Sequence, residues 1–195
     1  MKLKNIPGAT PIDEEILQGL IPNLTLQSEL NEYEEQNIAK AFLWASRSRT
    51  LKKELLSVSG ICILHKKMFG DTWNWAGQFR KRQTNIGVSP NRIQSDLKIL
   101  LDDVKFWIQN KTYSNEEIGI RFHHRLVLIH PFPNGNGRLS RLAADLLMQI
   151  LGEKSFSWSS SNLNQDGEIR KKYINALKVA DQTENYSLLL NFAKS

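Results

Sequence analysis

The sequence has 195 residues, of which 41% are hydrophobic and 24% are charged, as is ordinary for a globular protein that closes a core. Its 8 Phe, 5 Trp and 4 Tyr exclude a disordered chain, and its one cysteine excludes both a disulfide framework and a cysteine-built zinc site. The apolar runs are too short to span a bilayer, and no secretory signal follows Lys2 and Lys4. We therefore expect one cytoplasmic domain with a terminal arm and no membrane contact.

The formal net charge of +6 is unevenly distributed along the chain. Residues 1–35 carry two basic and seven acidic side chains, a net charge of −5, so the remaining 160 residues carry +11. A basic body attracts the phosphates of nucleotides or nucleic acids, and an acidic arm could lie over a basic site. The alternative is that the acidic side chains form an ordinary solvated helix face.

The spacing of apolar residues predicts a mostly helical chain. Residues 1–12 and 153–165 read as irregular. The segment 71–91 breaks the helical period, and within it residues 79–88 predict a small β-hairpin. The predicted helices cover residues 13–19, 30–48, 52–69, 91–107, 114–130, 139–150, 166–180 and 185–193. These elements predict an all-α fold with one small hairpin.

The stretch from His130 to Arg141 reads HPFPNGNGRLSR and lies between two predicted helices. Its glycines let backbone N–H groups turn inward at a helix N-terminus, an arrangement that binds anions. Arg138 and Arg141 are three residues apart, so both can donate to phosphate oxygens from one side of the helix. His130 at the mouth of the loop has an ordinary pKa suited to proton transfer. The combination predicts attack of a hydroxyl on a phosphoryl group, although a Gly/Asn-rich loop alone could simply join two helices.

Other polar clusters point to packing or solvation. His123, His124 and His130 do not form a metalloprotease pattern, and we expect His123, His124 and His65 to pack in the core. The basic clusters 47–49 and 170–172 lack interleaved aromatic residues and a helix-turn-helix pattern, so we do not expect nucleic-acid binding.

The stretch from His130 to Arg141 resembles the core motif of the Fic family of protein-modifying transferases, His-Pro-Phe-x-Asp/Glu-Gly-Asn-Gly-Arg-x-x-Arg. The match fails at one position, where Asn134 replaces the acid. Residues 63–70 and 75–80 are similar to the family's stretch before its flap, and the last two predicted helices are similar to its C-terminal end. The resemblance implies an all-α Fic-type helical domain over residues 30–195, with a small β-hairpin flap, preceded by an N-terminal arm over residues 1–29.

The opening of the chain resembles one bacterial branch of the family, called mobile mystery protein B. The similar stretches are residues 8–11, 19–22 and 29–32. Genes of this branch tend to sit beside one for a small helix-turn-helix protein, so the resemblance implies such a partner.

The family resemblance implies AMPylation, the transfer of AMP from ATP to a Ser, Thr or Tyr hydroxyl of a target protein with release of pyrophosphate. His130 would take the proton from the hydroxyl. The backbone N–H groups of Gly135, Asn136 and Gly137 and the Asn136 side chain would bind the phosphates. Arg138 and Arg141 would bind the outer phosphates. The flap segment, Thr84, Asn85, Ile86, Gly87 and Val88, would pin the target by strand-like pairing.

Asn134 stands where the family's acid holds Mg²⁺ between the phosphates. Its amide oxygen can ligate a metal, but hard cations favour carboxylates. Three alternatives follow: Mg²⁺ rests mainly on the phosphates, the donor is another phosphate-containing molecule, or the chain is a catalytically weakened nucleotide-binding regulator.

Many Fic proteins also carry an inhibitory helix with the pattern Ser/Thr-x-x-x-Glu-Gly/Asn, whose Glu pairs with the motif's second arginine, here Arg141. Residues 10–14 and 28–32 match this spacing but lack the final Gly or Asn. Glu14 and Glu32 are therefore the inhibitory candidates. We favour Glu14, because Glu32 falls in a helix that belongs to the body of the fold.

Overall fold

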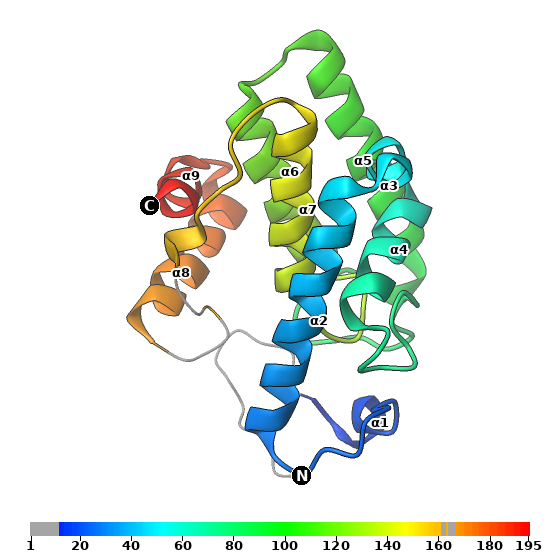
Figure 1. Ribbon diagram of the computed structural model, residues 1–195. Helices are drawn as coiled ribbons and strands as arrows, with labels where there is room; N and C mark the ends of the chain where they lie inside the picture. Colours follow the sequence, from blue (N-terminus) through cyan, green and yellow to red (C-terminus); the bar gives the residue numbers. More distant parts are fainter. Residues whose placement is uncertain (1–11, 161–162, 164–166) are drawn as a thin grey trace.

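The computed structural model describes residues 12–160, 163 and 167–195, which form helices joined by short loops (Figure 1). The α-helices are α1 (Glu14–Leu17), α2 (Gln27–Arg47), α3 (Arg49–Glu54), α4 (Val58–Phe69), α5 (Ile93–Asn110), α6 (Asn115–Ile129), α7 (Asn136–Ile150), α8 (Glu168–Thr183) and α9 (Ser187–Lys194). Short 3-10 turns cover Pro90–Arg92 and Trp158–Ser160. The β pairing among the described residues is limited to one isolated bridge between Leu20 and Trp73, so the prediction of an all-α fold is confirmed.

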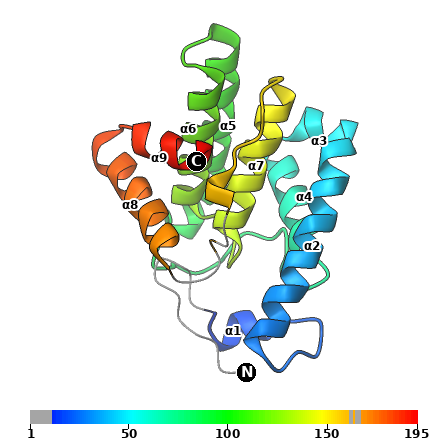
Figure 2. The ribbon, with the colours of Figure 1, turned by 60° about the vertical axis from the view of Figure 1, so that its left-hand side comes forward.

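The helix pair α6 and α7 lies at the centre of the bundle (Figures 1 and 2). The pair α2 and α4 packs on one side, and the pair α8 and α9 on the other (Figure 2). The main core joins α2 to α7, whereas a second, smaller core lies beneath α8 and α9 and includes Ile120, Met148, Tyr173 and Leu189. Of the helices described, none is long and apolar enough to cross a bilayer.

The predicted single helix over residues 52–69 is wrong, because the chain breaks between α3 and α4. Ser57 begins α4 by accepting a hydrogen bond on its Oγ from the Gly60 backbone N, at 3.0 Å. A Cβ atom at Gly60 would lie 1.8 Å from the carbonyl oxygen of Glu54. The glycine therefore lets the two helices meet at a sharp angle, and its place inside an apolar helical pattern is the signal for this break.

The predicted β-hairpin over residues 79–88 is also wrong. The backbone of this segment pairs with the end of α6 instead of with itself: Arg80 N donates to Pro131 O at 2.9 Å, and Val88 N donates to Ile129 O at 3.4 Å. The segment thus lies directly against the first residues of the motif. The spacing of residues along the chain does not reveal this pairing, because it joins residues 41 and 51 positions apart.

The N-terminal arm packs against the turn that follows α4. Ile21 N donates to Thr72 O and Asn74 N donates to Gly19 O, both at 2.9 Å. Beyond this turn, Glu15 forms an exposed ion pair with Arg82, next to the flap segment. Residues 8–11, on which part of the branch resemblance rests, lie outside the described residues.

Candidate active site

His130 stands at the C-cap of α6, where its backbone adopts φ 53° and ψ 60°. A left-handed conformation is rare for a residue with a Cβ and costs about 1–3 kcal/mol, so surrounding contacts must hold it. Its N–H still donates to Leu126 O at 3.2 Å, which closes the helix. The side chain is buried, with 6% of the residue exposed. The helix end therefore fixes this imidazole at the entrance of the loop.

The hydrogen bonds of His130 define which ring nitrogen can accept a proton. Its Nδ1 lies 3.3 Å from Val127 O, and a carbonyl can only accept, so Nδ1 carries the hydrogen. In the neutral ring the lone pair is then on Nε2. Burial lowers the pKa of His130 to about 4, the Val127 carbonyl opposes this shift, and the Arg80 guanidinium adds to it. At neutral pH the ring is therefore a neutral base.

The loop after His130 is closed by Asn136. The Asn136 side chain accepts from Phe132 N at 2.9 Å and donates to Phe132 O at 2.8 Å, and the residue is 2% exposed. Because both ends of this amide are used, the side chain shapes the loop, and the part of Asn136 that can serve a phosphate is its backbone N–H. The first N–H groups of α7 have no acceptor within the helix, which makes its N-terminus suited to an anion.

Two glycines of the loop differ in what the fold demands of them. Gly135 has φ 80°, and a Cβ there would lie 2.6 Å from the Phe69 ring, so the protein itself requires glycine. Among the described residues, a Cβ at Gly137 would meet Arg141 Nη1 alone, at 3.8 Å. The fold therefore does not require glycine at position 137, and its absent side chain leaves the start of α7 open to a ligand.

His65 supports the loop from below. Its Nδ1 accepts from Gly77 N at 2.9 Å, so Nε2 carries the hydrogen and donates to Asn134 O at 3.1 Å. The ring stacks on Phe132 with 3.8 Å between centroids. Burial lowers the pKa of His65 to about 3, which keeps this tautomer neutral. The sequence expectation that His65 is a packing residue describes its surroundings but misses its bond to the loop.

Arg138 is held by a buried carboxylate that sequence analysis missed. Its Nη1 donates to Glu34 Oε2 at 2.6 Å, and Glu34 also accepts from Trp73 Nε1 at 2.7 Å. The side chain of Glu34 is 6% exposed and that of Arg138 is 18% exposed. The available signal was a carboxylate on the buried face of α2, which otherwise carries Leu30, Ala41 and Ala45.

The proposed inhibitory residues lie elsewhere. Glu14 in α1 and Glu32 in α2 are both exposed, and the ion pair with a motif arginine comes from Glu34 to Arg138. Arg141 contacts a different neighbour, because its guanidinium lies 5.7 Å from the centroid of the Tyr173 ring on α8. The two motif arginines therefore contact different helices, α2 for Arg138 and α8 for Arg141.

The side-chain oxygen of Asn134 accepts two hydrogen bonds. Its Oδ1 accepts from Gly135 N at 2.7 Å and from Arg138 Nη2 at 3.3 Å. Among the described residues there is no group of three His, Cys, Asp or Glu placed to hold a metal ion. An amide oxygen beside a guanidinium is a poor ligand for a hard cation, so these residues do not fit a metal held by the protein alone.

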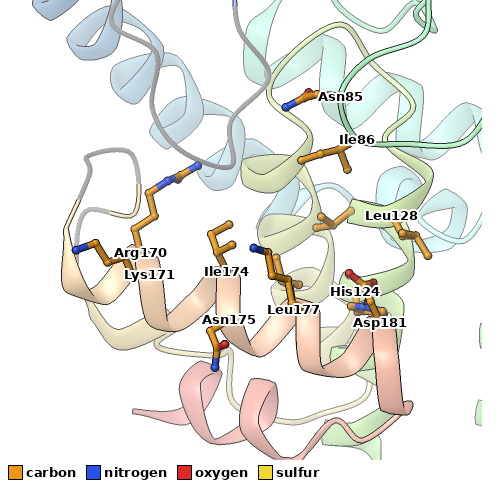
Figure 3. A pocket seen from close by; sticks show the side chains of 12 residues that line it. Asn85, Ile86, His124, Leu128, Arg170, Lys171, Ile174, Asn175, Leu177 and Asp181 are labelled. Carbon is orange, nitrogen blue, oxygen red and sulfur yellow. Dashed lines mark hydrogen bonds and ion pairs between the residues drawn. The ribbon is translucent and has the colours of Figure 1, made fainter.

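A cavity of about 550 Å³ lies between α6, α8 and the flap segment (Figure 3). Asn85 and Ile86 of the flap segment lie at one end, and α6 and α8 form its walls. Its lining includes the apolar side chains of Ile86, Val127, Ile174 and Leu177. At the far end His124 Nε2 and Asp181 Oδ1 are 2.8 Å apart. Sequence analysis predicted Asn85 and Ile86 as site residues. It did not predict that α8 forms one wall of the cavity.

Comparison with known proteins gives one consistent family. The profile described as the Fic/DOC family matches residues 55–148. The curated protein adenylyltransferase fic-1 of Caenorhabditis elegans is 32% identical over 143 residues, which cover 68% of this chain and 27% of that protein. Protein adenylyltransferase Fic of Drosophila willistoni is 28% identical over 159 residues, covering 79% of this chain and 30% of that protein. The chain thus spans about a third or less of the length of the curated relatives it matches.

Solved structures share the fold. Fic-1 (residues 134–508) from C. elegans aligns with 91% of this chain and 51% of that chain, with a TM-score of 0.64 and 25% identity. BepC from Bartonella tribocorum, solved with bound AMPPNP, aligns with 93% of this chain and 97% of its own, with a TM-score of 0.67 and 17% identity.

Proposed function

Because the chain belongs to the Fic/DOC family, we propose that it is a protein adenylyltransferase, which transfers AMP from ATP to a hydroxyl of a target protein and releases pyrophosphate. The observation that carries this proposal is the position of His130. A neutral imidazole with its lone pair on Nε2 ends α6, and the loop that follows it leads into the N-terminus of α7. A base next to an anion site is the arrangement that phosphoryl-group transfer needs.

The chemistry follows from these groups. Nε2 of His130 takes the proton as the Ser, Thr or Tyr oxygen of the target attacks the α-phosphorus of ATP. The bond from the α-phosphorus to the bridging oxygen breaks, and the electron pair leaves with pyrophosphate. The N–H groups of Gly135, Asn136 and Gly137 stabilise the phosphate charge, and Arg138 and Arg141 bind the outer phosphates.

The cavity between α6 and α8 would hold the nucleoside. Its volume of about 550 Å³ falls in the range of small-molecule sites. Apolar side chains in its lining suit a flat base, while the His124–Asp181 pair offers polar contacts at its end. The flap segment, with Asn85 and Ile86 on the cavity rim, would then lie between the nucleoside and the target.

Mg²⁺ would come with the donor and not with the protein. Asn134 offers one neutral oxygen that already accepts two hydrogen bonds, so a metal would rest mainly on the phosphates. For this reason the reaction above includes no step through a metal.

Replacing Asn134 by aspartate is expected to raise the rate of transfer and to lower the Mg²⁺ concentration that gives half-maximal rate. The substitution restores a carboxylate at the position where Asn134 brings none, and hard cations favour such ligands. The measurement is AMP transfer across a Mg²⁺ titration, with Asn185→Asp as the matched control, because Asn185 is exposed and its Oδ1 accepts a hydrogen bond from Ser187 N. A variant that is no faster at any Mg²⁺ concentration would show that this position does not serve the metal.

The test of the proposed activity uses two preparations of ATP, one labelled on the α-phosphate and one on the γ-phosphate. Label on the α-phosphate should appear on protein, either on the chain itself or on lysate proteins, and label on the γ-phosphate should not. Label from the γ-phosphate would instead indicate phosphate transfer. ATP binding without any labelling would favour the second candidate, a nucleotide-binding regulator, which the engagement of Arg138 by Glu34 supports.

The cytoplasmic location, the mobile mystery protein B branch and a helix-turn-helix partner remain predictions from the sequence. The division into an arm (1–29) and a domain (30–195) also remains a prediction, as does the restraint of the site by the arm.

If the arm restrains the site, Glu15 is a candidate for this role, because it forms an ion pair with Arg82 next to the flap segment. An exposed ion pair such as Glu15–Arg82 contributes about 0–1 kcal/mol. We therefore expect Glu15→Gln to raise self-labelling by less than about fivefold, and Glu14→Gly and Glu32→Gly to leave it unchanged. A rise with Glu14→Gly or Glu32→Gly would identify that residue as the inhibitor. No rise in any of the three, nor in a chain lacking residues 1–24, would exclude the arm.

A further inference from the structure

One buried guanidinium joins the flap side of the site to the base. Arg80 is 4% exposed. Its Nε donates to His130 O and its Nη1 to Arg82 O, both at 2.7 Å. Its Nη2 donates to Val88 O and, at 3.4 Å, to Ile129 O. Within the described part of the chain these carbonyl oxygens, and no carboxylate, receive its hydrogen bonds.

The backbone of the same residues is tied together as well. Arg80 N donates to Pro131 O, and Val88 N donates to Ile129 O. Arg80 therefore contacts the residues before and after the base and both sides of the flap segment. A buried charge with neutral partners is costly to remove from water, so a residue of this kind needs the full set of carbonyls to stay in place.

Gly87 shows how closely the parts fit. Its φ is 115°, and a Cβ there would lie 2.6 Å from Arg80 Nη2 and 2.7 Å from the Cβ of His130. The flap backbone, the guanidinium and the base thus meet with no room for a methyl group. Displacing any one of them displaces the other two.

We propose that Arg80 is a positioning residue, which fixes the backbone of His130 and the flap segment in one frame and so aligns the base with the target hydroxyl. The left-handed backbone of His130 needs such support, since it costs about 1–3 kcal/mol on its own. The anion loop after residue 134 is held separately, by His65 and Asn136. Loss of Arg80 therefore affects the base and the flap segment but not the phosphate site.

The inference rests on the proposed transfer reaction, and its test separates the two. Arg80→Gln removes the guanidinium, Arg80→Lys keeps the charge but loses the fork of donors, and Lys81→Gln removes an exposed neighbouring charge as the control. For Arg80→Gln we expect kcat to fall about 10²-fold, as for a small misplacement of a catalytic group. The dissociation constant for inorganic triphosphate, which probes the phosphate site without the cavity that Asn85 and Ile86 line, should stay within about twofold, because Arg80 does not support the phosphate site. Arg80→Lys should recover only part of kcat, and Lys81→Gln should match the parent.

Hydrogen exchange gives a readout that does not depend on activity. In Arg80→Gln, the amides of residues 80–90 should exchange faster while those of α7 keep the parent rates. Unchanged exchange and unchanged kcat in Arg80→Gln would overturn the inference. It would also be overturned if triphosphate binding and α7 protection were lost together with kcat, since Arg80 would then only support the fold. If the parent transfers no AMP, the proposed function fails, and the exchange pattern still decides whether Arg80 fixes this frame.

Discussion

Replacing His130 is expected to lower the rate of AMP transfer by about 10²–10⁴-fold, the usual cost of losing a positioned base. ATP binding should persist, because the phosphate site is built from the start of α7 and the cavity is lined by other side chains. The measurement is label transferred from the α-phosphate of ATP, beside the dissociation constant for ATP.

Two substitutions separate the chemical role of His130 from its backbone role. Alanine is strained at a φ of 53°, whereas asparagine tolerates the left-handed region. His130→Asn therefore keeps the loop conformation and removes the base. His130→Ala and His130→Asn should transfer AMP equally slowly. Label incorporation at the parent level in His130→Asn would exclude His130 as the base.

Removing the charge of Glu34 is expected to lower the free energy of unfolding by about 3 kcal/mol. The carboxylate is nearly inaccessible and compensates Arg138, and removing one partner of a buried ion pair costs about 3–5 kcal/mol. Glu34→Gln still offers an acceptor to Trp73 Nε1 but leaves the guanidinium without its counter-charge. Urea unfolding at pH 7 measures the difference.

Glu35→Gln is the matched control for this substitution, because it removes the same charge from the next residue, which is exposed. It should change the free energy of unfolding by less than about 0.5 kcal/mol. The double variant Glu34→Gln/Arg138→Met should cost less than the sum of the two single variants, since the two charges disappear together. Additive effects would mean that the ion pair contributes nothing to stability.

The sequence predicted the parts of the molecule that depend on local spacing. The apolar faces of α6 and α7, the start of a helix at residue 114 and the motif between His130 and Arg141 depend on residues within a few turns of one another. The break at Ser57 was missed, because Gly60 serves a contact with another helix and not a conformation of its own.

What the sequence did not reveal depends on partners distant in the chain. Glu34 and Arg138 are 104 positions apart, and the local sequence around each residue does not predict that they pair. The flap segment was expected to pair with itself, because extended residues close in sequence can form a hairpin. Instead, it forms hydrogen bonds with the carbonyls at the end of α6 and with the Arg80 guanidinium.

The two cores of the molecule divide the proposed nucleotide site between them. His130 and the anion loop belong with the main core, whereas α8, one wall of the cavity, packs on the smaller core with α9. Units with fewer buried contacts open at lower free energy than the global transition. The wall of α8 can therefore loosen while the base stays in place, and a nucleotide bound there stabilises α8 and α9 by its own binding energy. Release of the nucleotide would then be timed by the opening of the C-terminal helices and not by the catalytic loop.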